Sequence, residues 1–196
     1  MNEAGVNPTH TPEVQAELER FRNYLRFLAD IKLDRRLRSR IDASDIVQDT
    51  MLRAYAAWNT FRGNDPDQRL AWLRQILMRS VLHALRDARC AKRDVAREQR
   101  LDGVIDESSR QIEQWLAADQ TSPSEAAQQS EELLRVAEAV YQLPEAERVA
   151  VIGYYWQRGT LADISEELGR SVPAVAGLVH RGLGRLRDQL VDIPQV

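Results

Sequence analysis

Residues 161–176 read LADISEELGRSVPAVA, a pattern typical of two short helices joined by a tight turn. Gly169 supplies the sharp reversal of the chain, because glycine adopts left-handed backbone conformations without strain. Ser171 is placed to cap the second helix, and Pro173 in its first turn costs no internal hydrogen bond. Apolar residues recur at helical spacing on both segments, and those expected to share one core are Ile164, Leu168, Val172, Val175 and Val179. The stretch predicts a helix-turn-helix.

The second of these helices has a basic side. No acidic residue lies between Arg170 and Arg187, which suits insertion into the phosphate-lined groove of DNA. An ordinary helical hairpin with a solvated basic side fits the same residues, since helix-turn-helix geometry also occurs in proteins that do not bind DNA. Arg185 is assigned to phosphate, because it lies far from the helix N-terminus that usually reaches base edges. The residues assigned to the base-facing side are Arg170, Ser171, Ala174 and Arg181.

The remainder of the chain is also predicted to be helical, because glycine and proline are sparse and apolar residues recur at three- and four-residue steps. We expect helices over residues 12–33, 44–61, from about 70 onward, 131–143, 144–157, 161–168 and 172–190. The sequence contains no convincing strand. The predicted fold class is therefore all-α, with two small helical domains joined by an acidic linker.

Charge supports this division into two domains. Residues 69–100 contain nine basic and three acidic residues, whereas residues 102–147 contain two basic and eleven acidic residues, so the net charge of −3 hides two opposed blocks. Residues 117–129 (AADQTSPSEAAQQ) have almost no large apolar side chain and are typical of a linker. Trp115 suggests a short docked helix within the linker. The predicted parts are a disordered N-terminus (1–12), a first domain (13–101), a linker (102–130) and a second domain (131–191).

Several classes of protein are disfavoured by the composition. A single cysteine, Cys90, excludes an intramolecular disulfide framework. The sequence has no run of 18 apolar residues and no secretory signal, so we expect a soluble cytoplasmic protein without a membrane partner. The three histidines lie far apart and no glycine-rich phosphate loop follows a strand. We therefore expect no enzyme, no catalytic residue, no metal and no cofactor.

Two motifs mark the first domain. The first, DIVQDTMLRAY, begins at Asp45, and its polar residues surround Ile46 and Leu52 in the manner of an interface with a small apolar centre. Asp45 and Asp49 could act as a carboxylate pair, but a solvated binding surface is the expected use. The second motif joins Phe61-Arg-Gly to WLRQI at residues 72–76 and leads into the basic stretch. Aromatic and cationic side chains together suit unstacked bases, although a charge run is usually a solvated face.

In this order the parts resemble an extracytoplasmic-function sigma factor of the sigma-70 family, over roughly residues 18–190. The residues around 91–95 and 171–177 are similar to the planctomycete group of that family. The resemblance implies an RNA polymerase sigma factor that directs promoter recognition, promoter melting and transcription initiation, built from the two domains called regions two and four. The implied partners are promoter DNA and the RNA polymerase core, through its clamp coiled coil and flap, with an anti-sigma factor or a regulatory kinase for control.

The resemblance also implies roles for individual residues. The implied polymerase-binding residues are Asp45, Ile46, Val47, Gln48, Asp49 and Leu52. Those implied to act on the minus-10 element are Phe61, Asn64, Asp67, Gln68, Trp72, Arg79, Arg86, Arg89 and Arg93. Those implied to contact the minus-35 element are Arg170, Ser171, Ala174, Arg181 and Arg185. Two departures affect base preference at the minus-10 element, because family members often have Asn where Arg79 stands and Asp where His83 stands.

Two other functions fit parts of the sequence. A helix-turn-helix transcriptional regulator that binds duplex DNA without the polymerase core would leave the face of residues 45–52 unexplained. A helical adaptor or anti-sigma-like interaction protein that docks through the acidic linker would leave the basic helices without a use. Pull-down of polymerase separates the first alternative from a sigma factor, and promoter binding with polymerase separates the second.

Overall fold

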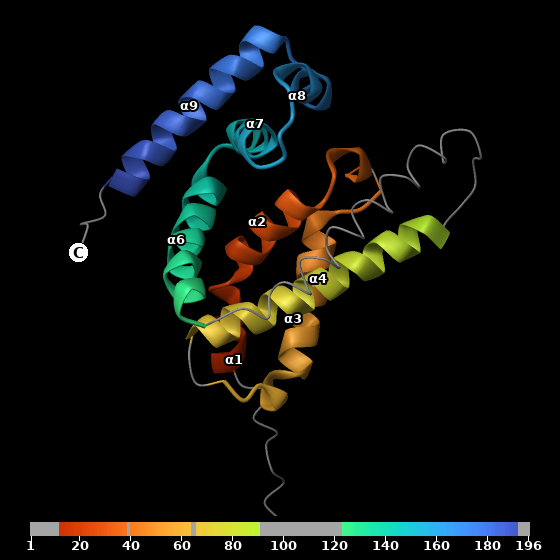
Figure 1. The fold of residues 1–196 in the computed structure, drawn as a ribbon. Helices are drawn as coiled ribbons and strands as arrows, with labels where there is room; N and C mark the ends of the chain where they lie inside the picture. The colour runs from red at the N-terminus through yellow and green to blue at the C-terminus, as the bar shows by residue number, and fades with distance from the viewer. Residues whose placement is uncertain (1–11, 39, 64–65, 91–122, 192–196) are drawn as a thin grey trace, which may run out of the picture. The chain divides into compact units, whose positions relative to one another are not determined.

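The computed structural model describes residues 12–38, 40–63, 66–90 and 123–191 of the chain, and every regular element within these ranges is helical (Figure 1). The predicted all-α fold class is confirmed. The chain separates into two compact units, with the boundary between Ser130 and Glu131. The predicted N-terminal segment and the short helix expected at Trp115 lie outside the described residues. No described helix combines the length and the apolar character that crossing a membrane requires.

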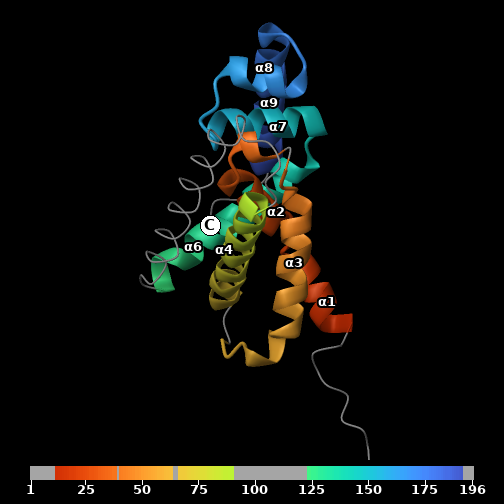
Figure 2. The same cartoon turned by 90° about the vertical axis from the view of Figure 1, so that its right-hand side faces the viewer.

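Residues 12–90 form a helical bundle whose two longest members run alongside each other (Figure 2). Its elements, in chain order, are α1 (Pro12–Glu19), α2 (Arg22–Lys32), the 3-10 helix η2 (Arg35–Leu37), α3 (Ala43–Ala56), the 3-10 helix η3 (Trp58–Thr60) and α4 (Pro66–Cys90). Helix α2 packs on both α3 and α4, and α1 packs on α3. Leu73, Leu77 and Leu85 of α4 are completely buried in this core. Burial of each such side chain stabilises the fold by about 1.5–3 kcal/mol.

The prediction of one continuous helix over residues 12–33 is wrong, because the chain bends at Arg20 and Phe21. No glycine or proline marks the bend. The two segments bury different residues against the bundle: α1 buries Val14 and Leu18, and α2 buries a longer apolar face that includes Leu25. Tertiary packing thus divides a stretch whose periodicity alone indicates a single helix.

Helix α3 begins at Ala43, one residue before the predicted start. The carboxylate of Asp42 accepts a hydrogen bond from the backbone N–H of Ser44 at 2.7 Å, so Asp42 is the N-cap of this helix. The helix ends at Ala56 and not at residue 61 as predicted, and Trp58 lies in the separate 3-10 helix η3. This ending brings Trp58 and Phe61 into the segment that leads to α4.

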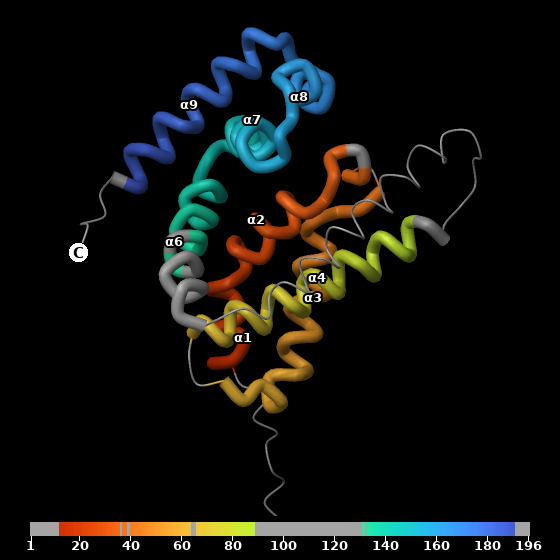
Figure 3. Tube along the Cα trace, viewed as in Figure 1, coloured from red at the N-terminus to blue at the C-terminus, as the bar shows by residue number. Residues whose placement is uncertain are grey.

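The second unit contains the predicted helix-turn-helix. Its elements are the C-terminal part of α6 (Pro123–Gln142), then α7 (Glu145–Tyr155), α8 (Leu161–Leu168) and α9 (Val172–Val191), which Figure 3 traces as a tube. Helix α6 begins at Pro123, within the stretch expected to be linker, which corrects the predicted start at residue 131. Proline is well suited to the first turn of a helix, because a backbone N–H at that position would have no acceptor within the helix.

Local sequence explains the geometry of the turn in this motif. The Thr160 hydroxyl accepts a hydrogen bond from the backbone N–H of Asp163, whose carboxylate in turn accepts one from the N–H of Thr160, so α8 starts in a capping box. Helix α8 ends at Gly169, whose φ of +60° is the left-handed conformation that glycine adopts readily. This part of the prediction is confirmed.

One of the five residues predicted for the core of the second unit lies outside it, and the core also contains residues that were not predicted. The buried cluster contains Ala150, Ile164, Val175, Leu178 and Val179, and Leu168 is packed against it. Val172 is 42% exposed, so its predicted place in the core is wrong. Val172 lies in the first turn of α9, outside this cluster, whereas Val175 and Val179, one and two turns further on, belong to it.

Candidate functional site

The outer surface of α3 is polar around one exposed leucine. Asp45 and Gln48 are exposed, and Leu52 has 62% of its surface exposed. Ile46 and Val47 are 3% and 1% exposed, because they lie on the side of α3 that packs into the bundle. The predicted use of these two residues as partner contacts is therefore corrected: their side chains belong to the core, and Leu52 provides the apolar surface on this face.

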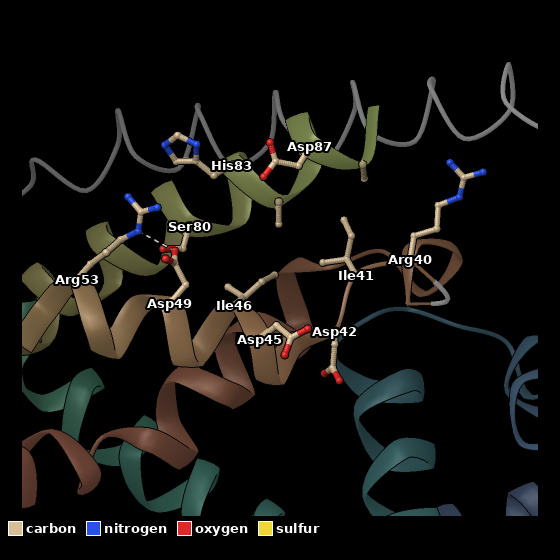
Figure 4. A pocket seen from close by; sticks show the side chains of 12 residues that line it. Arg40, Ile41, Asp42, Asp45, Ile46, Asp49, Arg53, Ser80, His83 and Asp87 are labelled. Carbon is tan, nitrogen blue, oxygen red and sulfur yellow. Dashed lines mark hydrogen bonds and ion pairs between the residues drawn. The ribbon is translucent and has the colours of Figure 1, made fainter. Parts of the chain in front are cut away.

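A groove of about 470 Å³ lies between α3 and α4 (Figure 4). Its polar lining consists of Arg40, Asp42, Asp45, Asp49, Arg53, Ser80, His83 and Asp87. The four carboxylates outnumber the two arginines, so the groove carries a negative charge at neutral pH. Such a surface attracts a partner with basic side chains.

Asp49 is an aspartate of this groove that is paired with an arginine of the same helix. Its Oδ2 accepts a hydrogen bond from Arg53 Nε at 2.7 Å, one turn further along α3. Partial burial opposes the charged form, but the Arg53 hydrogen bond and the neighbouring His83 favour it and hold the pKa of Asp49 below its ordinary value. A partner that binds Asp49 must therefore share it with Arg53 or displace that arginine.

Three aromatic side chains and one arginine gather where η3 leads into α4; we call this group the aromatic cluster. The rings of Phe61 and Trp72 are 5.1 Å apart, and those of Trp58 and Trp72 are 6.1 Å apart in an edge-to-face arrangement. The Arg69 guanidinium lies 5.3 Å from the centre of the Trp58 ring and 5.7 Å from that of Phe61. Arg69 also forms an ion pair with Glu17 of α1. All three rings remain partly exposed.

Gly63 is required by the position of the Phe61 ring. A Cβ atom at this glycine would lie 2.4 Å from Phe61 Cζ and 2.6 Å from Gln68 Oε1, which is too close without a shift. The Phe61 ring therefore lies directly over the glycine backbone. This contact is the physical reason for the Phe-Arg-Gly motif and places the ring at the entrance to the loop that precedes α4.

The other residues predicted to act on the minus-10 element are distributed along α4. Gln68 is exposed and Asp67 is partly exposed in its first turn, and Arg79 and Arg86 are exposed farther along. The two arginines are seven residues apart and so share one side of the helix. Asn64 and Arg93 lie outside the described residues, as does the side chain of Arg89.

Residues predicted to contact the minus-35 element lie at the N-terminal turn and along one side of α9. Arg170, Ser171 and Ala174 are exposed at its start. Arg181 and Arg185 also face solvent, but both form ion pairs with Glu147 of α7: Arg181 Nε is 3.5 Å from Oε1 and Arg185 Nε is 3.1 Å from Oε2. The structure therefore brings the two arginines together around one carboxylate.

Sequence reasoning missed three residues of these sites. Trp58 and Arg69 complete the aromatic cluster, and the signal for Arg69 is its place three residues before Trp72, on the same helix face. Glu147 precedes the buried Ala150 by three residues, so helical periodicity places its carboxylate on a buried face. A charged residue at such a position indicates a paired site.

Comparison with known proteins gives the same division of the chain. Residues 16–90 match the family described as sigma-70 region 2, and residues 133–186 match the family described as sigma-70, region 4. The chain is 27% identical over 180 residues to an RNA polymerase sigma-E factor of Streptomyces avermitilis, covering 89% of this chain and 87% of the relative. It is 26% identical to an RNA polymerase sigma-E factor of Streptomyces coelicolor, covering 89% and 88%. With region 2 and region 4 both present, the chain belongs to the sigma-70 family of RNA polymerase sigma factors, of the extracytoplasmic-function type.

Proposed function

We propose that this sigma factor divides promoter recognition between the aromatic cluster and the exposed start of α9. The aromatic cluster takes an unstacked base of the minus-10 element, and α9 enters the major groove of the minus-35 element. The observation that carries the proposal is the aromatic cluster: partly exposed rings held together beside a cation, which suit a base removed from its stack.

Melting needs no bond cleavage in this scheme. Removing a base from the duplex costs a few kcal/mol. Stacking of the base on an aromatic ring contributes about 1–3 kcal/mol, and arginine contacts to phosphate add to it. Arg79 and Arg86 lie on one side of α4, where they are placed to follow the backbone of a single strand. Binding free energy gained at these groups therefore offsets the cost of opening.

The proposed polymerase contact is the outer face of α3. Asp45 and Gln48 surround the exposed Leu52, and the groove beside this face carries negative charge. An apolar centre with polar and charged residues around it is the usual composition of a protein interface. The proposed partner surface is the clamp coiled coil of the polymerase core, with the flap as the contact of the second unit.

The proposed site of action is the cytoplasm, where polymerase and promoter DNA are present. Control by an anti-sigma factor or a regulatory kinase is part of the same proposal. It is motivated by the sequence of residues 102–130, in which six residues are acidic and one is basic, a composition that suits binding to a basic partner surface.

Run-off transcription with purified core RNA polymerase on a genomic promoter library tests the function and identifies a promoter. Permanganate footprinting on that promoter then measures melting. We expect open minus-10 DNA with the parent protein and little opening with Trp72→Ala, although both bind core polymerase. Equal opening by the two proteins would show that the aromatic cluster does not capture the base.

A matched control distinguishes loss of the cluster from loss of any aromatic side chain. Tyr154→Ala removes a ring that is 41% exposed on α7, in the second unit. We expect this variant to open the promoter as the parent does. Trp72→Phe, which keeps an aromatic face against Phe61, is expected to recover part of the opening.

A further inference from the structure

Glu147 is a buried carboxylate between two exposed arginines. Its side chain is 7% exposed, whereas those of Arg181 and Arg185 are 57% and 58% exposed. Each carboxylate oxygen has its own arginine: Arg181 Nε is 3.5 Å from Oε1, and Arg185 Nε is 3.1 Å from Oε2. A charge removed from water in this way needs a partner, and here the two partners are residues assigned to DNA.

Close packing of α9 on α7 creates this arrangement. A Cβ atom at Gly182 would lie 2.6 Å from Val151 Cγ2 and 3.5 Å from Glu147 Cβ, so the backbone of α9 touches α7 at this glycine. Arg181 and Arg185 are one turn apart on either side of the contact. Both side chains are therefore close enough to α7 to pair with the same carboxylate, that of Glu147.

The ion pairs leave part of each guanidinium available. A guanidinium has five N–H donors, and the atom closest to Glu147 is Nε in both arginines. Nη1 of Arg181 lies over Gly177, where a Cβ atom would be 3.2 Å away. The Arg181 group is thus directed along α9 toward the end that carries Arg170 and Ser171, while more than half of the side chain faces solvent.

Resting on the proposed role of α9 at the minus-35 element, we propose that Glu147 is a positioning residue for DNA binding. It holds the guanidinium groups of Arg181 and Arg185 along one side of α9. In place of the base contact predicted for Arg181, the outer N–H groups of both arginines then meet the phosphates. Long arginine side chains lose conformational freedom when DNA immobilises them, and that loss weakens binding. Glu147 fixes them before DNA arrives, so less freedom is lost on binding.

The test compares two variants of the full chain that remove the same charge from the same helix. Glu147→Gln removes the buried charge, and Glu145→Gln removes an exposed charge at the start of α7. Each variant is assembled with core polymerase, and its affinity is titrated on a duplex of the promoter selected by run-off transcription. Titrations at several salt concentrations give the slope of log K against log salt. Circular dichroism establishes that each protein is folded at the assay temperature.

We expect Glu147→Gln to bind about threefold to tenfold more weakly than Glu145→Gln, the range that corresponds to ordering one or two long side chains. The preference for the selected promoter over a mismatched duplex should not change, because phosphate contacts carry no sequence information. A purely structural ion pair would lower the unfolding temperature of Glu147→Gln but leave the affinity of the folded protein equal to that of Glu145→Gln. Equal or tighter binding by Glu147→Gln overturns the proposal.

The double variant Arg181→Ala with Arg185→Ala tests the underlying DNA contact separately. Loss of two phosphate contacts should reduce the salt slope by about 1.8. If this variant fails to fold because Glu147 has lost both partners, a triple variant that also carries Glu147→Gln replaces it, since that protein has no unpaired carboxylate at this position. An unchanged slope would refute the role of the arginines at DNA. A reduced slope together with equal affinities of the two glutamine variants would refute only the role of Glu147.

Discussion

The two units present different kinds of surface to their proposed DNA partners. In the first unit the aromatic cluster consists of Trp72 with the rings of Trp58 and Phe61 beside it, and Arg69 lies against these last two rings and is paired to Glu17. In the second unit the exposed side of α9 has arginines instead of rings, and Glu147 pairs with two of them. One surface depends on stacking and apolar area, and the other depends on charge.

This difference follows from the form of DNA that each surface is proposed to meet. An unstacked base exposes an apolar face, and the stacking of a ring on that face releases no counterions, although the arginines of α4 add contacts that do. Duplex DNA presents phosphates, and contacts with them release counterions and weaken steeply as salt rises. The two units should therefore respond differently to salt and to changes in packing.

The largest effect is expected where α9 touches α7. Gly182→Ala places a methyl group 2.6 Å from Val151 Cγ2, so the helices must separate, at a cost of about 1–3 kcal/mol in the free energy of unfolding of the second unit. Gly184→Ala is the matched control, because no atom lies within 4 Å of its Cβ position, and alanine should stabilise the helix by about 0.5–1 kcal/mol. Urea denaturation of both variants measures the difference. Equal stabilities would show that close packing at Gly182 is not needed.

The next effect concerns the polymerase contact of the first unit. Leu52 is 62% exposed, and Leu52→Ala should weaken binding of core polymerase by about 1–2 kcal/mol through loss of apolar area. Because no charge changes, the salt dependence of binding should stay as in the parent, unlike that of the arginine variants of α9. Leu52→Met, which keeps most of the apolar area, serves as the control. Titration of labelled core polymerase at two salt concentrations measures these affinities. Equal affinity of Leu52→Ala and the parent would contradict the assignment of Leu52 to the polymerase contact.

A smaller effect is expected at the loop before α4. Gly63→Ala displaces the Phe61 ring, because its Cβ atom would lie 2.4 Å from Phe61 Cζ. An aromatic pair contributes about 0.5–1.5 kcal/mol, so promoter opening should fall about twofold to tenfold while duplex binding by the second unit is unchanged. Permanganate reactivity and a minus-35 duplex titration on the same sample report the two quantities. A parallel loss of both would point to misfolding and remove the distinction between the units.

The smallest effect is expected for exposed ion pairs, which occur in both units. Arg22 Nε lies 2.5 Å from Glu19 Oε2 in the first unit, and Arg135 Nη2 lies 2.8 Å from Glu131 Oε1 in the second. Replacing Glu19 or Glu131 by Gln should change the free energy of unfolding by about 0–1 kcal/mol, far less than a change that disturbs Glu147. Thermal unfolding monitored by circular dichroism provides the comparison, and a large loss at Glu19 would contradict it.

The pH dependence of the Glu19 pair has a defined sign. The Arg22 hydrogen bond holds the pKa of Glu19 below its ordinary value of 4.5. A carboxyl group with a lowered folded-state pKa stabilises the fold above its unfolded-state pKa and loses that contribution as the pH falls through the folded-state value. The difference in the free energy of unfolding between the parent and Glu19→Gln should therefore be fully present at neutral pH and vanish in acid.

Local signals in the sequence were sufficient for most of the fold. The helical periodicity and the Gly169 reversal predicted the all-α class and the helix-turn-helix. These predictions succeeded because capping, turn chemistry and amphipathic spacing act between residues that are close in the chain. The same rules failed at Arg20 and Phe21, where packing bends the chain without a local breaker.

The sites themselves depended on contacts between distant residues. Periodicity places Glu147 on a buried face, but only the packing of α9 on α7 shows that Arg181 and Arg185 meet it. In the same way, Arg69 is one of many arginines in the sequence, and its contact with Glu17 of α1 distinguishes it from the others. Local sequence determined which faces are buried and which are charged. The tertiary structure decided which charge faces which, because a Coulomb interaction depends on distance in space and that distance is set by how helices pack.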